Sequence, residues 1–229
     1  MFNKKEAISI LLAAIVIGYT ISFKTITWLG WISAAGLALI VLFVHHIGQK
    51  LTALFYDCSI EVNLWTVKQF WLAKKSYFKF NFPLWVVLPV LLVIFTFGFV
   101  KWLALTTFEA IPLPSRVRRK YAELTEWDLA LITVGGLFFN ALLAVISQIF
   151  GWNNFAMLNL YFILFNLIPI SKLDGGKIFF GSIMLWIFSL VLTIVLILLL
   201  GTVSPITTII SAVLIAIIAV ILFYISMHT

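Results

Sequence analysis

The sequence predicts an all-α polytopic membrane protein with about six transmembrane helices, a re-entrant hairpin and a short β ribbon. Of its 229 residues, 64% are hydrophobic and 10% are charged, whereas a soluble domain has about 45–50% apolar and about 25% charged residues. The mean hydropathy is +1.19. Long apolar runs recur along the chain, with lysines and arginines at their ends. A soluble domain of this size cannot hide so much apolar surface, so lipid must cover much of it.

Six apolar runs approach the roughly 20 residues that a bilayer-spanning helix requires. The first run lacks a small-residue cleavage site and a second run follows it closely, so we expect a retained helix and not a cleaved signal peptide. The predicted spans are residues 6–23, 26–47, 128–150, 154–170, 177–200 and 204–227.

Two other segments do not match a simple spanning helix. Residues 49–83 alternate apolar and polar side chains, in CSIEVNLW and KSYFKFNF, and this alternation predicts short strands or an interfacial ribbon. Residues 84–108 form a seventh apolar run, but this run contains Pro89 and Lys101.

Basic residues predict the orientation of the chain, because they favour cytoplasmic loops. Lys4 and Lys5 place the N-terminus inside, and two crossings return the lysine-rich segment 49–83 to the same side. The next loop carries Arg116, Arg118, Arg119 and Lys120. This loop also stays inside if residues 84–108 enter and leave the bilayer on one side. We therefore predict a re-entrant hairpin, six crossings of the cell membrane and cytoplasmic termini.

The net charge of +7 does not indicate a nucleic-acid partner, because the basic residues lie at the ends of apolar runs, where phospholipid headgroups would face them. The expected partners are instead the lipid bilayer and other membrane proteins or transmembrane peptides. Cys58 is the only cysteine of the sequence, so no internal disulfide can form.

Ionisable residues gather at two places between or within the apolar runs. His45 and His46 close the second run, and Asp174 stands between the fourth and fifth. Such residues are costly at membrane depth and are functional candidates. In the hairpin topology both runs end at the cytoplasmic side, which brings His45 towards Asp174. The simpler alternative places the histidines at the headgroups and pairs Asp174 with Lys172 or Lys177.

Four motifs give the chain a resemblance to the site-2 protease (peptidase M50) family, and to its small archaeal members in particular. They are HHIGQK, FYDCSIEVNLW, GGLFFNALLA and FNLIPISKLDGGK, between about residues 41 and 178. The resemblance implies an intramembrane zinc endopeptidase that cuts substrate helices. It also implies one membrane-embedded domain over residues 1–229, with a core at about 26–178 and C-terminal helices at 177–227.

The family's HExxH motif is altered in this sequence. In that motif two histidines hold zinc and the glutamate activates a water molecule. The resemblance aligns His45 with the first histidine, His46 with the glutamate and Gln49 with the second histidine. Asp174 aligns with the family's third zinc ligand. A neutral amide is a poor zinc ligand beside an imidazole, and loss of the glutamate removes the expected general base.

Five further residues align with positions around the family's site. Asn140 corresponds to an asparagine that faces the site, although a hydrogen bond between helices would also explain it. Pro169 would end a helix after Asn166, and two glycines would permit a tight turn that points Asp174 inward. These two are Gly175 and Gly176.

Three functions stay open at this point. We favour a catalytically inactive pseudoprotease that binds or scaffolds membrane proteins, in which zinc binding is weak or absent. The second is an active metalloendopeptidase whose zinc is held by His45, Asp174 and either His46 or Gln49. The third is an unrelated transporter or a small subunit of a membrane complex.

Overall fold

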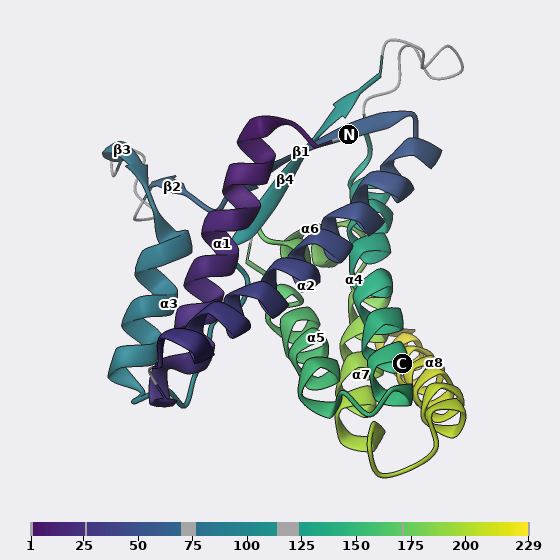
Figure 1. Cartoon of the computed structure of the whole chain (residues 1–229). Helices are drawn as coiled ribbons and strands as arrows, with labels where there is room; N and C mark the ends of the chain where they lie inside the picture. The colour runs from purple at the N-terminus through teal and green to yellow at the C-terminus, as the bar shows by residue number, and fades with distance from the viewer. Residues whose placement is uncertain (1, 26, 70–76, 114–123, 171, 229) are drawn as a thin grey trace. The chain divides into compact units, whose positions relative to one another are not determined.

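The computed structural model describes residues 2–25, 27–69, 77–113, 124–170 and 172–228. The basic run at residues 116–120 lies outside these ranges, as do the lysines at 74 and 75. The described chain is mostly helical, as predicted, with a small β component (Figure 1). Its elements are α1 (Lys4–Ser22), η1 (Phe23–Thr25), α2 (Trp28–Phe55), β1 (Cys58–Leu64), β2 (Val67–Gln69), β3 (Tyr77–Phe82), α3 (Leu84–Phe95), β4 (Thr106–Pro112), α4 (Glu126–Ile149), α5 (Asn153–Asn166), α6 (Asp174–Gly181), α7 (Ile183–Leu199) and α8 (Pro205–His228).

Four helices among the described residues are long and apolar enough to cross a membrane, namely α1, α2, α4 and α8. The remaining two predicted spans differ from the prediction. Residues 154–170 contain α5, which has 14 residues and ends at Asn166. Residues 177–200 are not one helix, because the extended backbone of Ser182 separates α6 from α7. The count of six crossings therefore stays a prediction.

Helix α2 continues further than predicted. Its 28 residues end at Phe55 and not near residue 47. The added turns keep an apolar side buried, since Ala53 is fully buried while Leu54 is exposed. His45 and His46 therefore lie inside a helix and are buried, so the alternative of headgroup-facing histidines at a helix end is wrong.

The β component occupies the region where alternation predicted strands. β1 pairs with β4, and β2 pairs with β3 in antiparallel register, Val67 opposite Phe82. Each sheet has two strands among the described residues. Such small sheets depend on neighbouring elements for stability.

The segment of residues 84–108 bonds to Trp65 near both of its ends. The Trp85 amide donates to the Trp65 carbonyl at 3.0 Å, and the Trp65 amide donates to the Leu105 carbonyl at 2.9 Å. Between these bonds α3 extends for 12 residues, or about 18 Å. The two ends of this segment therefore lie beside one residue, and the re-entrant hairpin stays a prediction.

The described chain divides into two compact units, residues 1–43 with 61–109 and residues 44–60 with 110–229. In the first unit, α1 packs tightly on α2, because a Cβ on Gly18 would lie 2.7 Å from Ala35. The carboxylate of Glu6 accepts hydrogen bonds from the amides of Asn3 and Val62, at 2.6 and 3.0 Å. This buried carboxylate thus connects the start of α1 to β1.

In the second unit, α4 packs against α5 and α6, and α7 packs against α8. The core is aliphatic, with Leu137, Leu160, Ile178 and Leu196 buried in one cluster. The division into two units leaves the single-domain prediction open.

Candidate functional site

The predicted site residues of α2 all lie in the second unit, where α2 passes close to α4. A Cβ on Gly48 would lie 2.7 Å from the Gly135 carbonyl oxygen, and a Cβ on Gly136 would lie 2.6 Å from the Gln49 side chain. Only residues without side chains permit this approach, as is common between membrane helices. The contact holds His45 and Gln49, one helical turn apart on one face, against α4.

Asp174 reaches the same place from another helix. It is the first residue of α6, which follows the end of α5 at Asn166. A Cβ on Gly175 would lie 2.3 Å from the backbone of Leu167, so this position tolerates only glycine. Asp174, Gly175 and Gly176 are all buried. That the two glycines turn Asp174 inward stays a prediction.

Three polar atoms form a triangle at the centre of the site. His45 Nε2 lies 2.8 Å from Asp174 Oδ2, Gln49 Nε2 lies 3.0 Å from the same oxygen, and the two nitrogens are 2.9 Å apart. All three side chains are at most 2% exposed. The predicted approach of His45 to Asp174 is confirmed, with Gln49 in direct contact with both.

When Asp174 is ionised, the three groups of the triangle cannot all form favourable hydrogen bonds with one another. If His45 Nε2 carries its proton towards Asp174, it meets the amide nitrogen of Gln49 as donor against donor. If it carries none, it meets the carboxylate as acceptor against acceptor. Turning the Gln49 amide by 180° brings two oxygens together instead. One edge is therefore always a contact between like groups, which is costly when buried.

His46 approaches the triangle through Gln49. Its Nδ1 lies 2.9 Å from Gln49 Oε1, and its ring meets the His45 ring edge-on at 5.1 Å between centroids. His46, which the resemblance aligns with the glutamate, thus contacts Gln49, and the structure shows no bond from His46 to Asp174. The alignment of His46 with the family's glutamate stays what the resemblance implies.

Asp174 also faces a lysine. Lys177 Nζ lies 3.9 Å from Asp174 Oδ1, so part of the simpler ion-pair alternative is present. Burial raises the pKa of the Asp174 carboxyl, but the hydrogen bond and charge of His45 together with the charge of Lys177 outweigh burial and lower the pKa below its ordinary value. The carboxylate is therefore held in its ionised form.

Several buried polar atoms near this cluster have no hydrogen-bond partner among the described residues. Neither amide atom of Asn140 has such a partner, although Asn140 is fully buried in α4, one turn after Gly136. The interhelical hydrogen bond considered for Asn140 is absent from the described residues. The other such atoms are His45 Nδ1, His46 Nε2 and Asn159 Oδ1.

Asn166 and Pro169 serve the local fold. Asn166 ends α5 and donates from Nδ2 to the Phe162 carbonyl at 2.9 Å, within the same helix. Pro169 lies in the turn that follows, before Asp174. Their predicted role as structural residues around the site agrees with these positions.

Two contact residues had no place in the predicted site. Gly136 packs under the His45 ring and Gln49, and Phe162 of α5 meets the His45 ring edge-on at 5.1 Å. The adjacent glycines in GGLFFN were a signal for close helix packing, whereas an aromatic among many aromatics in α5 offered none.

The donor set does not fit a zinc ion as it stands. Zinc takes four ligands at about 2.0–2.1 Å, which places tetrahedral ligand atoms about 3.3 Å or more apart. Here the three central atoms are closer, because they bond to one another, and only His45 and Asp174 are strong ligands. The described residues hold no group of three or more His, Cys, Asp or Glu that could bind a metal.

Searches against protein-family models, curated proteins and solved structures find no match to this chain.

Proposed function

We propose that this chain is a site-2-protease-like membrane protein that has lost proteolysis and binds or scaffolds other membrane proteins. The observation that carries the proposal is the side-chain cluster of His45, Gln49, Asp174 and His46. The side chains of the altered motif bond to one another. They therefore fill the space that a metal ion and a water molecule would need.

Catalysis fails on two separate counts in this proposal. A carboxamide stands where the resemblance expects a metal ligand, which weakens metal binding, and His46 stands where it expects the glutamate that takes a proton from water. General acid–base catalysis is typically worth about 10²–10⁴ in rate. A bound metal alone would therefore not restore the family's activity.

The unpartnered amide of Asn140 is fully buried, so a partner could reach it only after the surrounding helices move apart. A peptide group offers one donor and one acceptor, which matches the two unpartnered atoms of this side chain. The backbone of a partner's unwound transmembrane segment would satisfy both at once. Such a segment has unpaired backbone groups that need partners at membrane depth.

The proposal includes the hairpin topology, with six crossings and cytoplasmic termini. The return of residues 84–108 to Trp65 supports a re-entrant path. A single cysteine at Ser115, in a Cys58→Ser background, would react with a membrane-impermeant maleimide only after the cytoplasmic side is opened. Labelling of intact cells from outside would exclude this topology.

Metal analysis of the purified protein tests the function directly. We expect the wild type and Asp174→Ala to contain equally little zinc after dialysis against a zinc buffer. We also expect no cleavage of a transmembrane peptide by the wild type. One zinc per chain in the wild type, lost in Asp174→Ala, with cleavage that a chelator stops, would refute the pseudoprotease.

One observation favours a second candidate, the rearranged metalloendopeptidase. Reversing the Gln49 amide would direct Oε1 into the triangle and leave Nε2 to donate to His46 Nδ1, which makes three lone-pair donors of His45, Gln49 and Asp174. This candidate requires zinc-dependent cleavage that Gln49→Leu abolishes, whereas the pseudoprotease requires no cleavage in either protein.

A further inference from the structure

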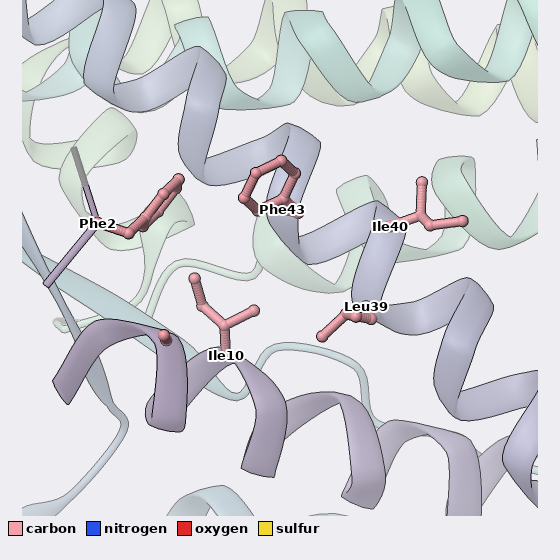
Figure 2. Close-up of a pocket in the computed structure, with 6 residues that line it drawn as sticks. Phe2, Ile10, Leu39, Ile40 and Phe43 are labelled. Atoms are coloured by element: carbon pink, nitrogen blue, oxygen red, sulfur yellow. The ribbon is translucent and has the colours of Figure 1, made fainter. Parts of the chain in front are cut away.

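A cavity of about 370 Å³ lies between α1 and α2 in the first unit. Figure 2 shows Ile10 of α1 pointing across it towards α2, with Leu39 and Ile40 of α2 on the other side. The rings of Phe2 and Phe43 flank one end, 5.2 Å apart between centroids. The lining is almost wholly apolar and is completed by Ala7.

The size of this cavity matches a flexible chain better than a protein element. Its volume lies within the range of about 300–1,000 Å³ for small-molecule sites. It would hold about twelve groups of about 30 Å³, the volume of one water molecule, and a methylene is of similar size. An α-helix about 10 Å across is too wide to enter it.

The charge beside the cavity indicates the headgroup. Lys4 and Lys5 are exposed at the start of α1, and Lys4 is three residues before Ala7, on the same face of the helix. Glu6, the acid between them and the cavity lining, accepts bonds from the Asn3 and Val62 amides and is buried. Positive charge on Lys4 thus stands one helical turn from the lining residue Ala7.

We propose that this cavity binds one acyl chain of an anionic phospholipid whose phosphate is held by Lys4 and Lys5. The chain is apolar like the lining, and the phosphate is the ligand that paired lysines at a membrane surface attract. This lipid site is separate from the cluster around Asp174 and does not depend on the proposed function.

Native mass spectrometry of the full chain tests the lipid site. The protein is exchanged into detergent with equal amounts of a phosphatidylglycerol and a phosphatidylcholine that carry identical acyl chains. We expect one retained lipid per chain with a preference for phosphatidylglycerol on the order of ten-fold, since each basic residue near the surface contributes measurably. No headgroup preference in the wild type would overturn the proposal.

Two pairs of variants separate the headgroup contact from the cavity. Lys4→Gln with Lys5→Gln should remove the preference, whereas Lys68→Gln with Lys101→Gln removes equal charge elsewhere and should keep it. Ala7→Leu should reduce retention of both lipids by filling the cavity, whereas Ala219→Leu on α8 should not. Unchanged retention in Ala7→Leu, or a polypeptide bound in place of lipid, contradicts the proposal. If Ala7→Leu does not fold, the two lysine pairs decide.

Discussion

Glu6 in the first unit and Asp174 in the second are both buried carboxylates, and their partners differ. Glu6 accepts from the backbone amides of Asn3 and Val62, whereas Asp174 accepts from the side chains of His45 and Gln49. A carboxylate bonded to backbone amides holds two elements of the fold together. A carboxylate bonded to an imidazole and an amide side chain is arranged for binding or chemistry. The partners, and not burial alone, distinguish a structural acid from a candidate functional one.

Restoring the motif should give the largest effect. His46→Glu with Gln49→His supplies the base and the ligand that the proposed site-2-protease resemblance requires beside Asp174, and we expect the double variant to bind one zinc per chain, measured by metal analysis after gel filtration. Asp174→Ala added to the double variant should abolish binding. If the double variant binds no zinc, the proposed resemblance does not extend to a metal site.

Separating α2 from α4 should disrupt the Asp174 cluster and leave Glu6 unaffected. A Cβ at Gly48 would meet the Gly135 carbonyl at 2.7 Å, whereas a Cβ at Gly36 on the same helix would meet nothing within 4 Å. Overpacking typically costs about 1–3 kcal/mol, so Gly48→Ala should lower the melting temperature in detergent. Gly36→Ala is the matched control and should keep or raise it. Equal melting temperatures for the two variants would contradict the close packing.

Neutralising the two acids compares their partners directly. In Glu6→Gln one of the two backbone amides faces an NH₂ group, and an unsatisfied buried group costs about 1–3 kcal/mol. In Asp174→Asn the remaining oxygen can accept from both His45 and Gln49, so we expect a smaller loss. Thermal unfolding in detergent measures both. A larger loss for Asp174→Asn than for Glu6→Gln would show that the charge of Asp174, and not its hydrogen bonds, holds the cluster.

The smallest expected effect is a gain in stability at Asn140. Its amide is buried with neither atom bonded, so Asn140→Leu removes an unsatisfied polar group, which is worth about 1 kcal/mol or more. We expect a higher melting temperature and weaker retention of co-purified membrane proteins. Asn159→Leu is not equivalent, because Asn159 Nδ2 donates to the Phe155 carbonyl. A loss of stability in Asn140→Leu would mean that its amide has a structural partner.

The candidate site could be predicted further than the fold around it. The contact of His45 with Asp174 joins residues 129 positions apart, and it was predicted from the topology and the family resemblance, not from local backbone geometry. The hydrogen bond from Val62 to Glu6 also joins distant residues, 56 positions apart, and was not predictable. No local pattern distinguishes Glu6 from the other acids near helix starts.

By itself, the sequence determined that the chain is an apolar, mostly helical protein with spans long enough for a bilayer, because hydropathy sums over residues whatever their neighbours are. Only the tertiary structure decided that α2 continues to Phe55, that Ser182 divides residues 177–200, and that residues 84–108 return to Trp65. The end of a helix and the return of a segment depend on hydrogen bonds between backbone groups. The partners in these bonds can be distant in the sequence.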